Sequence, residues 1–168
     1  MVHHITADDV HRLIEEFDTR DPFELAEAVG AEVVFADLGS LKGMYTYIKG
    51  NRFIVINNAL DNETARIVCA HELGHDQLHR DFVKDSFLRE TVLYDLKDRT
   101  EYEANVFAAE LLLSDDELLR YAEEETTISE IAALTCTDVN LIALKLSGMV
   151  RRGYALNQFD YRSDFLKY

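Results

Sequence analysis

Apolar positions recur at helical spacing along most of the chain. The first such stretch covers residues 7–17, where the apolar side chains fall on one face. A second helix is marked by Asp21 as a capping residue, by Pro22 at the first helical position and by Gly30 as a stop signal. The same spacing predicts further helices over residues 62–79, 100–113, 114 onward, 128–134 and 138–151, with Thr127 and Thr137 as caps of the last two.

Between the second and third predicted helices the pattern changes to one typical of β-strands. Residues 31–37 are short and β-branched, residues 43–49 alternate, and residues 53–57 form a strong apolar strand. Gly50-Asn51 is a turn signal, so the last two strands predict a β-hairpin. A small three-stranded sheet among many helices makes the expected fold class α+β and mostly helical.

The composition is typical of a folded domain with a small helical appendage. The chain has 168 residues, of which 48% are hydrophobic, and this is enough to bury a core. We expect one domain over residues 1–125 and a small helix-turn-helix-like subdomain over residues 126–168 that packs on it. The apolar runs are too short to cross a membrane, and the first residues lack the pattern of a signal peptide. Cys69 and Cys136 form no disulfide or metal pattern, so a cytoplasmic location is expected.

The chain is strongly acidic, with a formal net charge of −15. Such a chain is expected to repel nucleic acid, and no direct contact with nucleic acid or membrane is predicted. Solvated helix surface is the favoured explanation for acidic runs such as Glu123-Glu124-Glu125, and a docking face for a basic partner is the alternative. The segment Val139–Lys145 is too apolar to lie in a DNA groove, which favours a packed subdomain over DNA reading.

The most specific chemical signal is the motif His71-Glu72-Leu73-Gly74-His75. Residues four apart in a helix share a face, so the two histidines present their imidazoles to one point. Two neutral imidazoles suit Zn²⁺, which needs one further protein ligand and an open position to be catalytic. Glu72 lies beside that point and can act as a general base and then as a general acid. The alternative is a surface helix with two incidental histidines, and the amphipathic, partly buried helix disfavours it.

The third metal ligand is left open by these residues alone. His79 continues the same stripe, but three histidines on one helix span about 12 Å, so a supporting role is expected for it. In the predicted helix over residues 100–113, Glu103 and Glu110 lie among apolar residues, where a carboxylate is costly unless paired or metal-bound. Glu101 looks outward by comparison. The spacing does not decide between Glu103 and Glu110.

The histidine motif extends to Leu78-His79, and a second motif follows it. The second motif reads Glu101-x-Glu103-Ala104-Asn105-x-Phe107-Ala108-Ala109-x-Leu111-Leu112. Together the two motifs resemble the ImmA/IrrE family of metallopeptidases, and the segments Lys42–Tyr45 and Ile54–Asn57 are similar to strands of that family. The resemblance covers about residues 25 to 115. Where the family motif often ends in Leu-Met-Pro, this chain has Leu112-Leu113-Ser114, and serine keeps the helix boundary as an N-cap.

The resemblance implies a zincin-like domain of the gluzincin type with one catalytic Zn²⁺. It implies cleavage of a protein substrate, a DNA-binding repressor of a mobile element or stress response. The implied roles are zinc ligation by His71, His75 and Glu103, base catalysis by Glu72, and support by His79 and Asn105. The alternative function is that of a metal-binding regulatory partner that binds a repressor without cutting it.

Two further expectations concern the substrate. We expect the strand Ile54-Val55-Ile56-Asn57 to lie at the edge of the sheet, where an extended peptide can pair with its backbone. A group that stabilises the oxyanion is also expected. Tyr45, Tyr47 and Tyr94 are candidates for that role, and the sequence does not choose among them.

Overall fold

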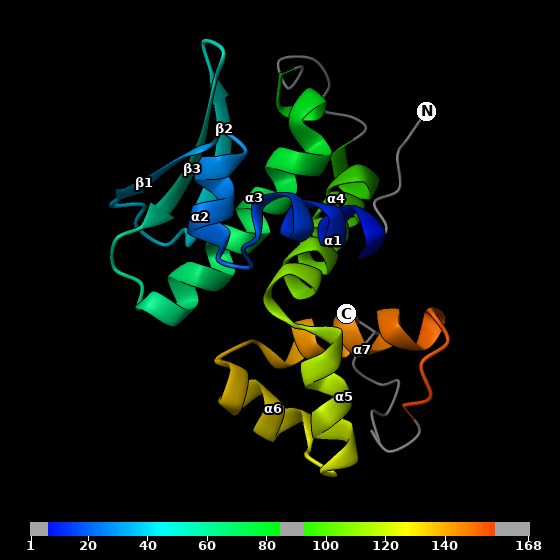
Figure 1. Cartoon of the computed structure of the whole chain (residues 1–168). Helices are drawn as coiled ribbons and strands as arrows, with labels where there is room; N and C mark the ends of the chain where they lie inside the picture. Colours follow the sequence, from blue (N-terminus) through cyan, green and yellow to red (C-terminus); the bar gives the residue numbers. More distant parts are fainter. Residues whose placement is uncertain (1–6, 85–92, 157–168) are drawn as a thin grey trace. The chain divides into compact units, whose positions relative to one another are not determined.

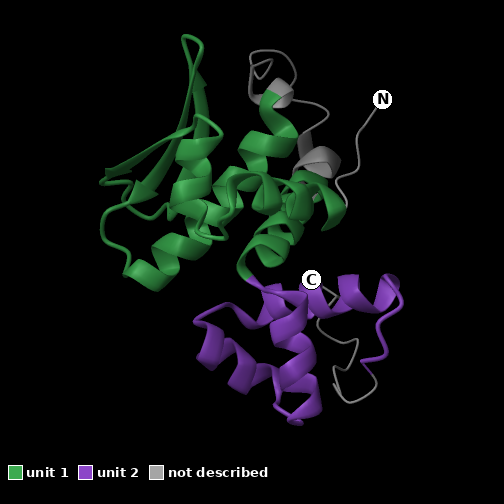
Figure 2. Cartoon of the chain, viewed as in Figure 1, with its two compact units in different colours: residues 1–112 green, residues 113–168 purple. Residues whose placement is uncertain are grey.

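A computed structural model of the chain describes residues 7–84 and 93–156, with the side chains of residues 7–80 and 99–156 (Figure 1). The described residues are mostly helical with one three-stranded mixed sheet, which confirms the α+β class. The chain divides into two compact units, Met1–Leu112 and Leu113–Tyr168 (Figure 2). This division comes earlier than the boundary expected after residue 125, and the helix that starts after Ser114 therefore belongs to the second unit.

The sheet of the first unit has the strand order β1-β3-β2. Strand β1 (Glu32–Ala36) runs parallel to β3 (Asn51–Asn57), and β2 (Gly43–Ile48) pairs antiparallel with β3. Lys49 (φ 50°) and Gly50 (φ 91°) both take left-handed conformations. Such a two-residue turn matches the twist of antiparallel strands, so it closes the predicted hairpin.

The segment Ile54-Val55-Ile56-Asn57 lies in the central strand, and the expectation that it forms an edge is corrected. Val55 lies opposite Val34 in β1 and opposite Met44 in β2, so β3 is paired on both sides. Its backbone groups are used within the sheet and cannot accept a further strand. The apolar pattern identifies a strand, but the order of strands depends on which side of the hairpin β1 pairs with, which no local pattern encodes.

The described part of the first unit also contains α1 (Ala7–Phe17), α2 (Pro22–Ala28), α3 (Asn62–Lys84) and α4 (Leu93–Leu112). Asp21 caps α2 as predicted, and its side chain accepts hydrogen bonds from the backbone N–H groups of Phe23 and Glu24. Helix α4 begins before the expected residue 100. Arg20 donates to the carbonyl oxygens of Glu110 and Leu111 at the end of α4, where helical partners are lacking.

Helix α3 packs against β2 and β3 on one side and against α4 on another (Figure 1). Gly74 allows α3 and α4 to approach closely, because a Cβ atom there would lie 3.0 Å from Cα of Ala104 and 3.1 Å from its carbonyl oxygen. A larger residue would push the two backbones apart. Gly74 therefore sets the distance at which side chains of α4 meet the histidines of α3.

A buried ion pair joins α3 to the sheet. Asp76 is fully buried, and its Oδ2 accepts hydrogen bonds from Arg52 at 2.8 Å and from Arg80 at 3.3 Å. Arg52 also donates to the carbonyl oxygen of Val29, so one guanidinium group connects β3, α3 and the end of α2. Breaking a buried pair by removing one partner typically costs about 3–5 kcal/mol. This contact therefore fixes α3 on the sheet.

The second unit contains α5 (Asp115–Glu123), α6 (Ile128–Thr135) and α7 (Val139–Arg151). Thr127 caps α6 as predicted, but α7 is capped by Asp138 and not by Thr137. The hydroxyl of Thr137 instead donates to the carbonyl oxygen of Thr135. Cys136 (φ 48°) takes the left-handed conformation that glycine usually provides after a helix, which explains how the turn forms without glycine.

The inner side of α7 is buried within this unit. Lys145 is 1% exposed, and its ammonium group lies 2.5 Å from Oδ1 of Asp115. Arg152 binds the same carboxylate at 3.0 and 2.9 Å. In the described part of the chain, no single helix is long and apolar enough to cross a membrane. Helices α6 and α7 reach that length and apolarity only together, across a bend of 112°.

Candidate metal centre

The histidine motif lies in the middle of α3, and its two imidazoles come together on the face toward α4. Nε2 of His71 lies 3.1 Å from Nε2 of His75. Burial, followed by the neighbouring imidazoles of His71 and His79, lowers the pKa of His75 to about 3. His75 is therefore neutral near pH 7, and the neutral imidazole is the form that binds a metal ion.

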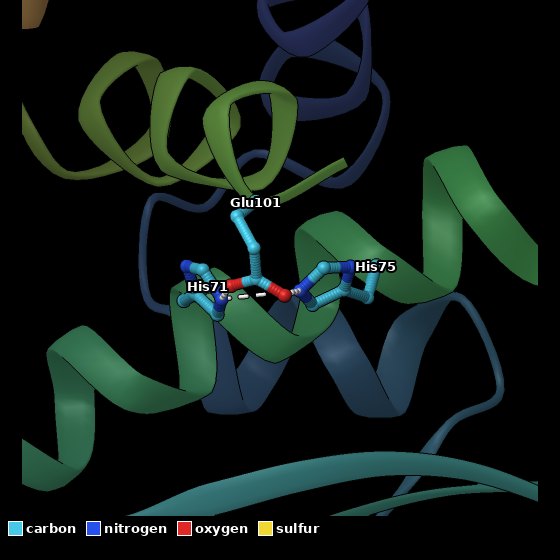
Figure 3. A group of neighbouring side chains, drawn as sticks. All are labelled: His71, His75 and Glu101. Carbon is cyan, nitrogen blue, oxygen red and sulfur yellow. Dashed lines mark hydrogen bonds and ion pairs between the residues drawn. The ribbon is translucent and has the colours of Figure 1, made fainter. Parts of the chain in front are cut away.

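Glu101 of α4 supplies a carboxylate to the same point. Its Oε2 lies 3.3 Å from Nε2 of His71 and its Oε1 lies 3.5 Å from Nε2 of His75. Figure 3 shows this carboxylate between the two imidazoles. One donor atom from each of the three side chains lies within 4.8 Å of the others. Two imidazole nitrogens and one carboxylate are the donor set of many catalytic zinc sites.

Glu103, the third ligand implied by the family resemblance, lies elsewhere. Its Oε2 is 3.0 Å from Nε2 of His79, and its Oε1 accepts a hydrogen bond from Nε of Arg99 at 2.8 Å. Burial raises the pKa of this carboxyl group, but the hydrogen bonds from His79 and Arg99 outweigh burial and hold the pKa below its usual value. Glu101 therefore meets His71 and His75, whereas the contacts of Glu103 are with His79 and Arg99.

Glu110, the other candidate from the sequence, also lies away from the histidine pair. It is 2% exposed, and its Oε2 is 3.4 Å from Nε2 of His11 in α1. A sequence signal for Glu101 exists in the small residue Ala104, which packs on Gly74 in the structure. Positions 101 and 104 share a face of the helix, so the face of α4 that packs on α3 carries Glu101.

Two further side chains contact the histidines at their Nδ1 atoms, on the side of each ring away from Glu101. Oδ1 of Asn105 lies 2.8 Å from Nδ1 of His71, and Nδ1 of His79 lies 3.1 Å from Nδ1 of His75. Both contacts use the ring nitrogen that faces away from the site. They leave the two Nε2 atoms directed at the point that Glu101 approaches, which is the usual arrangement around metal-binding histidines.

Glu72 lies on the side of α3 that faces β2. It is 9% exposed, and a Cβ atom at Gly43 would lie 3.3 Å from its Oε1, so the strand passes close to the carboxyl group. Burial raises the pKa of Glu72, assisted by the charge of Glu101, although His71 and the backbone N–H of Tyr45 oppose the shift. A carboxylate with a raised pKa is a stronger base, which suits proton transfer from water.

Comparison with known proteins identifies the family of the chain. Residues 26–147 match the IrrE N-terminal-like domain, a peptidase family. The chain belongs to this family. It is similar to the uncharacterised immunity region protein 2 of Bacillus phage phi105, with 39% identity over 137 residues that make up 81% of this chain and 85% of that protein. It is also similar to the metallopeptidase ImmA of Bacillus subtilis strain 168, with 29% identity over 106 residues, 63% of this chain and 62% of that protein.

The family membership confirms the resemblance seen in the two motifs and makes the chain a metallopeptidase. A metallopeptidase needs a metal ion, and the donor set of His71, His75 and Glu101 fits one. These three residues come from both α3 and α4. The close approach of these helices at Gly74 is therefore part of the candidate metal centre.

The three tyrosines that are candidates for oxyanion stabilisation differ in what the structure shows of them. Burial and the carboxylate of Asp76 raise the pKa of Tyr45, which places its hydroxyl with the ion pair of Asp76 and Arg52. That position disfavours a role for Tyr45 at the histidine pair. The side chain of Tyr94 lies outside those described. Nothing in the structure assigns the role to Tyr47.

Proposed function

We propose that this metallopeptidase is a zinc-dependent endopeptidase of the gluzincin type, with His71, His75 and Glu101 as zinc ligands. The observation that supports it best is the meeting of Nε2 of His71, Nε2 of His75 and the Glu101 carboxylate at one point. Zinc is favoured over harder metal ions because imidazole suits zinc, whereas calcium and magnesium prefer oxygen ligands only.

The proposed chemistry follows from the position of Glu72 next to His71 in α3, where the charges of His71 and Glu101 both act on its carboxyl group. Zinc, when bound, supplies a Lewis acid that makes water more acidic and polarises a peptide carbonyl group. The Glu72 carboxylate takes the proton of the attacking water on one of its oxygens and then gives it to the leaving amine. Its burial keeps competing water away from the proton that it carries.

The proposed substrate is a DNA-binding repressor. Such a protein carries a basic surface, and the net charge of −15 favours its approach. The phage relative is named for an immunity region, which supports a role in the control of mobile-element genes. We place the reaction in the cytoplasm, where a repressor acts. In the alternative function, the chain binds the repressor without cutting it.

Incubating the purified protein with the helix-turn-helix repressor encoded by a neighbouring gene tests this function. We expect cleavage in the presence of zinc, loss of cleavage with a chelator, and recovery when zinc is restored. Fragments are identified by gel electrophoresis and mass spectrometry. An intact repressor in a stable complex with the zinc-loaded protein would contradict proteolysis and support the alternative.

We also propose that an extended substrate segment pairs with β2, the outer strand beside Glu72. The N–H of Asn57 donates to the carbonyl oxygen of Lys42 at 2.9 Å. Hydrogen-bonded pairs alternate along an antiparallel ladder, so the backbone groups of Gly43 and Tyr45 point away from β3. The effect of the Tyr45 N–H on the pKa of Glu72 supports the closeness of this edge to the general base.

Substrate peptides with single N-methylated amides test the pairing with β2. Because a paired strand uses every second N–H, methylation at alternate positions is expected to raise KM by about 2–10-fold per lost hydrogen bond. Methylation at the positions between them serves as the matched control and leaves KM unchanged. An equal effect at all positions, or at none, would contradict strand pairing.

A further inference from the structure

A chain of side-chain contacts leads from His75 to a second carboxylate on α4. Nδ1 of His75 lies 3.1 Å from Nδ1 of His79, and Nε2 of His79 lies 3.0 Å from Oε2 of Glu103. Nε of Arg99 donates to the other oxygen of Glu103 at 2.8 Å. The side chain of His79 is 5% exposed, so water has little access to replace these contacts.

The direction of these hydrogen bonds follows from the last group of the path, the Glu103 carboxylate. A carboxylate that is bound to Arg99 has no proton to donate, so Nε2 of His79 donates to Glu103. With the ring proton of His79 on Nε2, its Nδ1 has a lone pair and accepts a hydrogen bond from the Nδ1–H of His75. This leaves Nε2 of His75 with a lone pair that faces His71 and Glu101.

A bare pair of imidazoles would not adopt this arrangement. Nδ1 of His71 faces Oδ1 of Asn105 at 2.8 Å, so it too is the protonated nitrogen of its ring. The two Nε2 lone pairs then face each other across 3.1 Å, close to the Glu101 carboxylate. Lone pairs and a negative charge repel one another in the absence of a cation. The hydrogen bonds behind the rings thus hold three donors in position for a metal ion.

We propose that Glu103 is a positioning residue that acts through His79 to fix the tautomer and orientation of His75 for metal binding. This inference rests on the proposed function, in which His75 is a zinc ligand. It gives Glu103 a role different from direct ligation. A metal-bound histidine usually donates to a carboxylate or carbonyl directly. Here an additional imidazole lies between the ligand and the carboxylate.

Nitrogen NMR of the metal-free, histidine-labelled protein tests the tautomers directly. We expect His75 to carry its proton on Nδ1 and His79 to carry its proton on Nε2. The substitution His79→Phe keeps a ring of similar size but removes the acceptor, so His75 is expected to become a mixture of tautomers. A wild-type His75 protonated mainly on Nε2 would overturn the proposal, and this measurement requires no variant to fold.

Zinc affinity tests the link between Glu103 and His79. By competition with a chromophoric chelator, His79→Phe and Glu103→Ala are each expected to weaken zinc binding by about 10–100-fold. The double variant is expected to bind as weakly as His79→Phe alone, because the two residues act through one path. Additive losses, or an unchanged affinity in Glu103→Ala, would overturn the path.

Two further variants separate positioning from general damage to α4. Glu103→Gln keeps an oxygen that accepts from His79, so it is expected to retain the wild-type tautomer of His75 and most of the zinc affinity. Tyr102→Ala removes the neighbouring side chain, which is 45% exposed, and is expected to bind zinc as the wild type does. If Tyr102→Ala weakened binding as much as Glu103→Ala, the loss would reflect the helix and overturn the proposal.

The failure of this proposal can be told apart from the failure of the proposed function. If the wild type bound no zinc, or if His75→Ala bound it as tightly as the wild type, the proposed metal site would fail. If zinc bound through His75, and the substitution His79→Phe did not weaken zinc binding, only the proposed path through His79 and Glu103 would be wrong. Thermal unfolding of each variant verifies that the comparison is made between folded proteins.

Discussion

Changing Glu72 to glutamine is expected to lower kcat by about 10²–10⁴-fold, the usual contribution of a general base. Glutamine has nearly the same shape but cannot take a proton from water. Zinc binding is expected to be unchanged, because Glu72 faces β2 while the three proposed ligands meet on the α4 side. The measurement is cleavage of the repressor under single-turnover conditions, together with the zinc content of the purified variant.

The substitution is not expected to unfold the protein. The fold raises the pKa of Glu72, mainly by burial, so above that pKa the ionised carboxylate destabilises the folded state. Below the usual pKa of a glutamate this cost is absent, and a neutral amide avoids it at every pH. Glu63→Gln, a swap of the same kind in the first turn of α3, is the matched control and should leave kcat unchanged.

This variant also separates the two candidate functions. If Glu72→Gln still relieved repression of the partner's target genes while no fragment appeared, binding without cleavage would be the mechanism. If repression persisted while zinc and repressor still bound, proteolysis would be required. A reporter gene under the repressor's control measures both outcomes.

Changing Glu101 to alanine is expected to weaken zinc binding more than any change in the residues behind the histidines. Loss of an outer hydrogen-bond partner costs about 10–100-fold in affinity, and loss of a direct ligand is expected to exceed about 100-fold. The reason is geometric: Glu101 meets both imidazoles, at 3.3 and 3.5 Å, whereas Glu103 contacts His79 and Arg99.

Cobalt substitution provides the spectroscopic test of this assignment. The visible absorption of bound cobalt depends on the number and type of its ligands, so Glu101→Ala should change the spectrum. Glu103→Ala should lower the affinity with little change in the spectrum of the loaded site. If instead Glu103→Ala changed the spectrum and lost more affinity than Glu101→Ala, the assignment of the third ligand to Glu103 would be restored.

The local features of this protein are determined by its sequence. The spacing of His71 and His75 brings their imidazoles to one face, because that relation needs only one turn of helix. The capping of α2 by Asp21 and of α6 by Thr127 follows equally from neighbouring residues. The predicted hairpin also forms, with its turn at Lys49-Gly50, one residue before the expected Gly50-Asn51, since the left-handed conformations of Lys49 and Gly50 suit a two-residue turn.

The order of the strands was decided by tertiary structure alone. The residues Ile54–Asn57 form the predicted strand, yet they lie in the middle of the sheet. Apolar patterning reports that a strand is buried, but the pairing of β1 with β3, which skips the neighbouring strand β2, is chosen by tertiary packing. The division of the chain after Leu112 is of the same kind, because it depends on which helices pack together.

The carboxylate that meets the two histidines could not be predicted from the sequence. Apolar neighbours suggested Glu103 and Glu110 alike, and the family resemblance implied Glu103. The family motif also contains Glu101. The choice depends on how α4 is rotated about its axis, and that rotation is set by the close approach of Ala104 to Gly74 in another helix. The sequence by itself thus determined that the two imidazoles meet on one face of α3 and that the candidate base Glu72 adjoins them. Packing between α3 and α4 decided which carboxylate meets them, because two helices contact through faces that neither sequence segment specifies alone.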